Sequence, residues 1–285
     1  MTRLPEWLRR SIPVETSGLT RNILEQYRLN TVCESALCPN RSECWSQRTA
    51  TFMILGNRCT RRCGFCAIET GIGELVQEDE PERLAEAVRR LGLRYVVITS
   101  VARDDLRDEG AEQFYRCVRA VKERIQEVEV EVLTPDFHAQ EELIARVCEA
   151  GPTVYNHNLE TVARLQRLVR PQGRYERSLR VIEYVKGVFP LICAKSGLML
   201  GLGEKEEEVV EAASDLRAAG CEILTLGQYL SPSGEHLKVV EFIPPEVFRR
   251  LADTIRQMGF REVYAGPYVR SSYHAEETFH LGKGI

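Results

Sequence analysis

The chain is poor in long apolar runs, in net charge and in low-complexity sequence. No stretch approaches the roughly 20 consecutive apolar residues of a membrane helix. The first twenty residues contain no apolar core of the kind that a secretory signal peptide has. The formal net charge is −4, so no basic field over the whole molecule attracts nucleic acid. These absences predict a cytoplasmic protein whose partners are neither nucleic acid nor membrane.

Paired C-x2-C zinc knuckles and regularly spaced histidines are also missing. The five histidines share no ligand spacing, and we expect His157 and His274 to be structural side chains. The ten cysteines are many for a chain that we expect to stay in a reducing compartment, where thiolates are kept for metal ions more often than for disulfides. Four of them are scattered among apolar positions and are expected in the core: Cys117, Cys148, Cys193 and Cys221.

The other six cysteines form two triplets with different spacings: Cys33, Cys38 and Cys44 (C-x4-C-x5-C), then Cys59, Cys63 and Cys66 (C-x3-C-x2-C). Three thiolates leave one iron of a 4Fe–4S cube without a protein ligand, so that iron can bind a small molecule. The second spacing is typical of radical S-adenosylmethionine enzymes, in which the open iron chelates the amino and carboxylate groups of the cofactor. A structural zinc site or an electron-transfer centre is the alternative interpretation.

From residue 51 onward, short apolar segments alternate with segments of helical periodicity. The expected strands span residues 51–56, 94–100, 128–133, 153–157, 191–201 and 222–230. The expected helices span residues 81–91, 111–126, 140–150, 159–169, 175–188, 204–219 and 246–258. This alternation predicts an α/β fold with a parallel sheet. Eight units would close a barrel, so six units predict a partial βα barrel with an open side.

The same pattern divides the chain into three parts. Residues 1–50 are expected to be an N-terminal extension that carries the first cysteine triplet, with Pro39 and Asn40 marking a loop. Residues 51–245 are expected to be the partial barrel, and residues 246–285 a C-terminal extension.

Polar residues that follow the expected strands are candidates for cofactor binding, because parallel βα barrels place their chemistry on those loops. Ser100 follows one strand, and Asn158 and Glu160 follow another; an amide and a carboxylate there could bond ribose hydroxyls or the methionyl ammonium group. Phe65 lies between the last two cysteines, where its ring could stack on adenine. Helix capping, a solvated charge or plain loop packing remain the alternative roles for these residues.

Seven segments together resemble the lipoyl synthase family: TVCESALCPNRSECW, TSVARDDL, YNHNLETV, VRPQGRYERSL, KSGLMLGLGE, LTLGQYLSPS and GPYVRSSYHA. The resemblance covers nearly all of residues 5–277. It implies a partial barrel of the radical S-adenosylmethionine type and a second 4Fe–4S cluster on the first triplet. It also implies that a serine of the R-S-S-Y motif ligates the fourth iron of that cluster. We assign this ligand and catalytic role to Ser272, with Ser271 as the alternative.

The resemblance further implies radical insertion of two sulfur atoms, at C6 and C8 of a protein-bound octanoyl-lysine, with the second cluster as sulfur donor. The implied partners are an octanoylated carrier (the glycine-cleavage H protein or an acyltransferase lipoyl domain), a low-potential electron donor and iron–sulfur assembly proteins. A sulfur inserter that acts on a free substrate, like biotin synthase, is the rival. The first triplet and R-S-S-Y argue against it.

Overall fold

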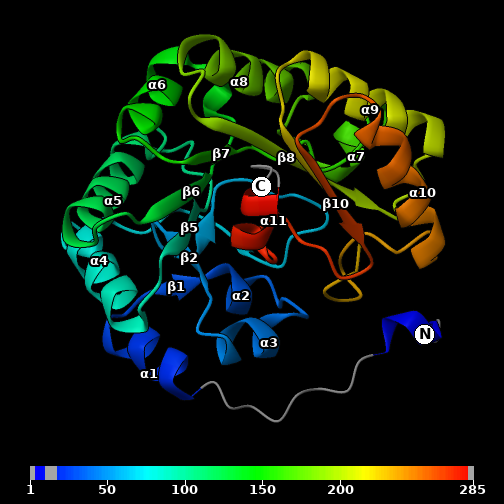
Figure 1. Ribbon diagram of the computed structural model, residues 1–285. Coiled ribbons are helices and arrows are strands. Elements are labelled where there is room, and N and C mark those ends of the chain that lie inside the picture. Colours follow the sequence, from blue (N-terminus) through cyan, green and yellow to red (C-terminus); the bar gives the residue numbers. More distant parts are fainter. Residues whose placement is uncertain (1–3, 10–17, 282–285) are drawn as a thin grey trace.

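A mainly parallel sheet organises the computed structural model, which describes residues 4–9 and 18–281 (Figure 1). The strands are β1 (Asn30–Thr31), β2 (Thr51–Ile54), β5 (Tyr95–Ser100), β6 (Glu129–Leu133), β7 (Val154–Asn156), β8 (Cys193–Leu200), β9 (Ile223–Gln228) and β10 (Glu262–Gly266). They are ordered β1-β2-β5-β6-β7-β8-β9-β10. Neighbours from β2 to β10 are parallel, and β1 is antiparallel to β2. The predicted α/β fold with a parallel sheet is confirmed.

Helices cover the outside of this curved sheet (Figure 1). They are α4 (Glu80–Leu91), α5 (Ala111–Arg124), α6 (Glu141–Glu149), α8 (Tyr175–Val188), α9 (Glu206–Ala218) and α10 (Pro245–Arg256). In α4 the apolar side chains of Leu84, Val88 and Leu91 recur at helical spacing and are buried. Gly92 follows this helix at φ 70°, a left-handed conformation that glycine adopts without steric cost and that ends the helix. No helix of the described ranges is long and apolar enough to cross a membrane.

The remaining elements are short. They are η1 (Glu6–Leu8), α1 (Gly18–Gln26), α2 (Val32–Ser35), α3 (Arg41–Ser46), β3 (Arg58–Cys59), β4 (Glu69–Thr70), η2 (Phe137–Ala139), η3 (Ala163–Leu165), α7 (Gln166–Val169) and α11 (Ala275–Leu281). The strands β3 and β4 form a separate two-stranded sheet.

The structure differs from the expected elements in three places. Strand β10 adds a seventh parallel strand, inside the range assigned to the C-terminal extension; only Val263 of that strand is buried, so its apolar pattern is weak. Helix begins at Ala163 rather than at 159, because Glu160 pairs with Leu198 of β8. Two short helices that were not expected carry Cys33 and Cys44, whereas Cys38 lies in the loop between them, which contains Pro39 and Asn40 as expected. The three-part division of the chain stays a prediction.

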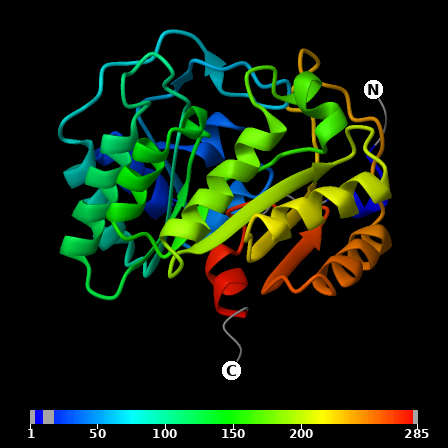
Figure 2. The same cartoon turned by 90° about the horizontal axis from the view of Figure 1, so that it is seen from above.

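The two ends of the barrel are closed differently. At the amino-terminal ends of the strands, Ala275 and Phe279 of α11 pack against Tyr95, Val97, Val154, Cys193 and Ile223. Figure 2 shows α11 on the side opposite the loops that follow the strands. The carboxyl ends of the strands are therefore the end of the barrel left for a site.

A layer of polar side chains lies inside the barrel, above the α11 contact. The carboxylate of Glu131 accepts hydrogen bonds from Lys195 Nζ (2.9 Å to each oxygen), Tyr95 Oη (2.7 Å) and Asn156 Nδ2 (2.8 Å). All four side chains are buried. The ammonium group and the hydrogen bonds compensate the buried carboxylate, whereas Asn156 Oδ1 has no hydrogen-bond partner in the described residues. This buried layer is called the polar floor.

Candidate metal and cofactor site

A cavity of about 390 Å³ lies at the carboxyl ends of the strands. The sequence candidates that line it come from four separate segments: Cys33, Cys38 and Cys44; Phe65 and Cys66; Asn158 and Glu160; Ser271 and Ser272. Residues of β6, β8 and β9 form its barrel side, among them Leu133, Gly197 and Thr225. Leu133 and Gly197 lie two residues after Glu131 and Lys195 of the polar floor, and Thr225 pairs with Gly197 in the sheet. The cavity therefore brings together the first triplet, Cys66 of the second triplet and the serines of the R-S-S-Y motif, whereas Cys59 and Cys63 are not among the residues that line it.

The second triplet is held by backbone hydrogen bonds to the loop after β5. The N–H groups of Arg61 and Ala102 donate to the Cys59 sulfur at 3.4 and 3.3 Å. Thr60 N and Oγ1 both donate to the carbonyl oxygen of Ala102, at 3.1 and 3.0 Å. Gly64 N donates to Val169 O at 2.9 Å. Hydrogen bonds from N–H groups to a cluster sulfur are among the contacts by which a protein tunes an iron–sulfur site, and here they fix the position of the Cys59 sulfur.

Arg61 anchors the same loop from below. Its side chain is buried, with 7% of the residue exposed. The guanidinium group donates to both oxygens of Asp104 at 2.7 to 3.0 Å and to Asp136 Oδ1 at 2.7 Å. Arg177 donates to the other oxygen of Asp136 at 3.2 Å. Burial opposes ionisation of Asp136, but the charges and hydrogen bonds of Arg61 and Arg177 keep its pKa well below the usual range.

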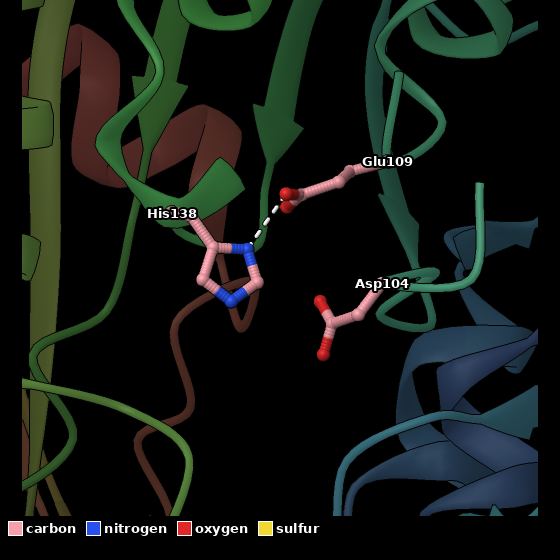
Figure 3. Close-up of side chains that lie close together, drawn as sticks. All are labelled: Asp104, Glu109 and His138. Carbon is pink, nitrogen blue, oxygen red and sulfur yellow. Dashed lines mark hydrogen bonds and ion pairs between the residues drawn. The ribbon is translucent and has the colours of Figure 1, made fainter. Parts of the chain in front are cut away.

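Three possible metal-binding side chains, Asp104, Glu109 and His138, point toward one another beside this anchor (Figure 3). Their donor atoms lie within 4.8 Å of one another. His138 Nδ1 and Gln140 Nε2 donate to Glu109 Oε1 at 2.6 and 2.9 Å, and Asp104 is bound by Arg61. A guanidinium nitrogen of Arg61 also lies 4.0 Å from Glu109 Oε2. Because Arg61 already supplies the positive charge, we assign this group to anchoring of the loop and not to a metal ion.

Neither cysteine triplet forms such a compact group in the described part of the chain. The sulfur ligands of one tetrahedral zinc ion, with Zn–S bonds of about 2.3 Å, would lie closer to one another than the three sulfur atoms of either triplet do. Burial raises the pKa of the Cys33 and Cys66 thiols to about 11 and those of Cys44 and Cys63 to about 12. Thiols of this kind become thiolates only when a cation is bound. The donor sets therefore fit a group larger than one ion, such as a 4Fe–4S cube.

The first triplet is positioned by short helices. Thr31 Oγ1 accepts from Glu34 N at 3.3 Å and so caps α2, which carries Cys33. Asn40 precedes α3, which carries Cys44, and its side-chain Nδ2 donates to Tyr268 O at 2.8 Å. This triplet therefore depends on a contact with the C-terminal part of the chain.

The C-terminal segment 267–274 lies across the open side of the barrel and presents both serines. Asn158 Nδ2 donates to Ser271 Oγ at 3.1 Å, and Thr51 Oγ1 donates to Ser272 Oγ at 2.9 Å. Tyr273 Oη donates to Glu43 Oε1 at 2.8 Å. At the end of β9, a Cβ atom on Gly227 would lie 2.0 Å from the Val269 carbonyl oxygen. Only glycine lets the segment pass this close to the strand.

Three of the four cofactor candidates line the cavity, and Ser100 does not. Among residues 4–9 and 18–281, the buried Oδ1 of Asn158 and the buried hydroxyl oxygen of Ser100 have no hydrogen-bond partner. Glu160 adopts φ 70°, a left-handed conformation that is uncommon for a glutamate. Burial raises the pKa of its carboxyl group, and the positive charge of Arg170 opposes that rise. Phe65 is half-buried in the cavity wall.

Buried side chains beneath residues 158–160 hold this loop in place. Arg170 donates to the carbonyl oxygens of Asn158 and Leu159 at 3.2 and 3.3 Å and to Ser178 Oγ at 3.1 Å. His157 contacts Thr134 O through Nδ1 and Ser178 Oγ through Nε2, each at 2.9 Å. Burial lowers the pKa of His157 to about 4, so the ring is neutral at pH 7. Its expected structural role is confirmed.

The sequence patterns missed Arg61, Thr51 and Gly227. Arg61 lies inside the C-x3-C-x2-C loop, and that position could have singled it out. The contacts of Thr51 and Gly227 join residues that are far apart in the chain, and no local pattern signals them.

Comparison with known proteins gives one consistent family. Residues 53–216 match the model of the Radical SAM superfamily. The chain is 55% identical to the lipoyl synthase of Rhodopirellula baltica over 96% of this chain and 88% of that protein. It is 52% identical to the lipoyl synthase of Caldanaerobacter subterraneus subsp. tengcongensis, over 99% of each chain.

Solved structures with a similar fold are more distant in sequence. Methylornithine synthase aligns with a TM-score of 0.55 and 15% identity, over 90% of this chain and 84% of that one. Coproporphyrinogen III oxidase from Escherichia coli, a radical SAM enzyme, aligns with a TM-score of 0.53 and 13% identity, over 73% of this chain and 52% of that one. At these identities the likeness shows the fold alone.

Proposed function

The chain belongs to the lipoyl synthase family of radical S-adenosylmethionine enzymes, and on that premise we propose that its two cysteine triplets hold two 4Fe–4S clusters facing one cavity. The family's activity is radical-mediated insertion of two sulfur atoms, at C6 and C8 of a protein-bound octanoyl-lysine. The observation that carries the proposal is the shared cavity: Cys66 of one triplet and all three cysteines of the other line it. An acyl chain in that cavity would lie between the source of the radical and the source of sulfur.

A 4Fe–4S cluster on Cys59, Cys63 and Cys66 supplies the low-potential electron that cleaves S-adenosylmethionine. The protein's own part is to hold the cofactor. Phe65, Asn158 and Glu160 are assigned to this role because they line the cavity beside Cys66. Asn158 Oδ1 and Ser100 Oγ are buried and have no partner in the described chain, so each can accept or exchange a hydrogen bond with a bound polar group.

The cluster on Cys33, Cys38 and Cys44 is in this proposal a substrate, because it gives up sulfur. Ser272 is assigned as the ligand of its fourth iron, with Ser271 as the alternative, since both serines line the cavity with the three cysteines. A serine oxygen is a poor ligand for iron next to thiolate and can leave when sulfur is withdrawn. One turnover per chain is then expected, unless iron–sulfur assembly proteins rebuild the cluster.

The proposed protein substrate is an octanoylated carrier, either the glycine-cleavage H protein or an acyltransferase lipoyl domain. A low-potential electron donor is the further partner. A cytoplasmic location is part of the same proposal, and the ten free cysteines are what supports it.

The decisive experiment is anaerobic incubation with an octanoyl-lysine peptide, S-adenosylmethionine and a strong chemical reductant. Mass spectrometry should show a peptide that has gained two sulfur atoms, together with 5′-deoxyadenosine. The protein should be brown and contain about eight irons per chain, as two cubes require. A colourless, zinc-loaded protein that leaves the peptide unchanged would contradict the proposal.

A further inference from the structure

Three segments that are far apart in the sequence meet around Gly64, beside the cavity. Gly64 N donates to Val169 O, and Leu237 N donates to Gly64 O, each at 2.9 Å. Arg62 N donates to Gln172 Oε1 at 3.3 Å. A Cβ atom on Gly64 would lie 2.8 Å from the Leu237 side chain, so the contact is close. Residues 59–66, which carry the second triplet, are here called the radical loop. The radical loop, the loop around α7 and the loop after β9 therefore form one continuous surface.

This surface carries exposed basic side chains: Arg62, Arg167, Arg174 and Lys238, here called the basic rim. None of the four forms an ion pair with an acidic group within residues 4–9 and 18–281. Arg174 donates only to the backbone oxygens of Pro171 and Gly173. Residues 57–68 and 163–174 contain no aspartate or glutamate, although the whole chain has a net charge of −4. In the third segment, the loop after β9, the exposed Glu235 and Glu241 offset part of this charge. The rim is thus a mainly positive surface on an acidic protein.

An exposed apolar side chain accompanies these charges. Leu168, next to Arg167, is 58% exposed, and its carbonyl oxygen lies 3.5 Å from the position of a Cβ on Gly64. Unpaired arginines around an apolar side chain are typical of a surface that binds another protein.

The basic rim borders the cavity directly. Phe65 and Cys66 follow Gly64 in the chain and line the cavity, as do Ser231 and Pro232 of the loop after β9. His236 Nε2 donates to Cys66 O at 3.0 Å and so joins that loop to the radical loop. Figure 2 shows the loops that follow the strands gathered on one side of the molecule, opposite α11. When an acyl-lysine arm enters the cavity from this side, the carrier domain that bears the arm lies against the basic rim.

We propose that the basic rim and Leu168 dock an acidic face of the carrier domain that presents the octanoyl-lysine. This inference rests on the proposed function and adds to it the surface that selects the protein substrate. Complementary charge accelerates encounter and orients the carrier, and its effect is weakened by salt. A free octanoyl-lysine peptide has no acidic face, so its turnover does not need the rim.

The test compares two substrates in one assay driven by a chemical reductant, and it follows the first turnover of each chain. KM here is the substrate concentration that gives half of the maximal single-turnover rate, and kcat/KM is the second-order rate constant at low substrate concentration. The variant is Arg167→Glu combined with Lys238→Glu, and the substrates are an octanoylated lipoyl domain with acidic surface and an octanoyl-lysine peptide. We expect KM for the domain to rise about tenfold and KM for the peptide to change by no more than about twofold. In the wild type, kcat/KM for the domain should fall with added salt, and the variant should show a weaker salt dependence.

The matched control is Arg249→Glu, which reverses an exposed charge on α10 without touching the rim. It should leave both KM values unchanged. Peptide turnover by the double variant shows that the variant is folded and loaded.

Three results would overturn the docking surface. They are an unchanged KM for the domain, an equal rise for domain and peptide, or a defect that occurs only when a protein electron donor replaces the chemical reductant. The last result would assign the rim to the electron donor. If the wild type acts on neither substrate, the proposed function itself fails and the docking surface fails with it.

Discussion

The two cysteine triplets are held in different ways. The triplet Cys59–Cys66 spans a short loop that the barrel itself anchors, through Ala102, Val169 and the buried Arg61. In the triplet Cys33–Cys44, Cys33 and Cys44 lie on two short helices and Cys38 lies in the loop between them, and this region is tied to the C-terminal segment. Those ties join residues separated by 228 positions (Asn40 and Tyr268) and 230 positions (Glu43 and Tyr273). The second triplet is thus part of the barrel, whereas the first is completed only where the N-terminal and C-terminal parts of the chain meet.

This difference implies that the two halves of the reaction can be separated. Damage at the chain ends should remove sulfur transfer and leave cofactor cleavage intact. Damage in the radical loop should remove both, because without the radical no carbon centre is formed to accept sulfur.

Cys63→Ala should have the largest effect. Two thiolates cannot hold a cube with its open iron toward the cofactor, so formation of 5′-deoxyadenosine should cease. The iron content should fall from about eight to about four per chain, because the distant first triplet is untouched. Chromatography of the nucleoside products and iron analysis measure both. Appreciable 5′-deoxyadenosine from this variant would show that the second triplet is not the radical site.

Cys38→Ala should stop product formation without stopping cofactor cleavage. The radical loop is anchored independently of residue 38, so 5′-deoxyadenosine should still form, uncoupled from sulfur insertion. Mass spectrometry of the peptide should show no thiolated product. A lipoyl product from this variant would mean that the sulfur comes from another source.

The serine pair should give a large but incomplete loss. Ser272→Ala should keep both clusters, since three thiolates still hold each cube, and should lose most lipoyl formation. Ser272→Cys should bind the iron more tightly and slow sulfur transfer. Ser271→Ala is the matched variant, because the Ser271 hydroxyl lines the same cavity. Ser271 Oγ accepts a hydrogen bond from Asn158, whereas Ser272 Oγ accepts one from Thr51. Full product yield from Ser272→Ala with loss in Ser271→Ala would move the ligand to Ser271.

Gly227→Ala should have a smaller effect of the same kind. The added Cβ would overlap the carbonyl oxygen of Val269, so the serine-bearing segment must move away from β9. We expect lipoyl formation to fall about tenfold while 5′-deoxyadenosine formation is kept, since a misplacement of about 1 Å can cost a factor of ten to a hundred. Gly234→Ala is the control, because nothing lies within 4 Å of its added Cβ. An equal loss of both products in Gly227→Ala would argue for general misfolding.

The features that could be predicted from the sequence are those that depend on residues close together in the chain. The periodicity of Leu84, Val88 and Leu91 is local, and the helix it predicts is present. The cysteine spacings are local too, and they predict two triplets of ligands, four of whose six cysteines line one cavity. The bond between Arg61 and Asp136 spans 75 residues, and that between Thr51 and Ser272 spans 221. Such pairs depend on the order of strands in the sheet, which no single segment encodes. Strand β10 was missed because its residues are mostly half-exposed and lack an apolar pattern.

The polar floor made by Tyr95, Glu131, Asn156 and Lys195 affects the order of binding and release. Glu131, Asn156 and Lys195 lie two residues before Leu133, Asn158 and Gly197, which line the cavity. A buried layer built around the ion pair of Glu131 and Lys195 admits neither an alkyl chain nor a nucleoside, and α11 is packed behind it. The cofactor and the acyl arm must therefore arrive by the same side. Each of the two sulfur insertions needs its own radical, so methionine and 5′-deoxyadenosine from the first S-adenosylmethionine must leave past the half-converted chain before a second can enter. Turnover is thus an ordered exchange in a pocket closed at its base.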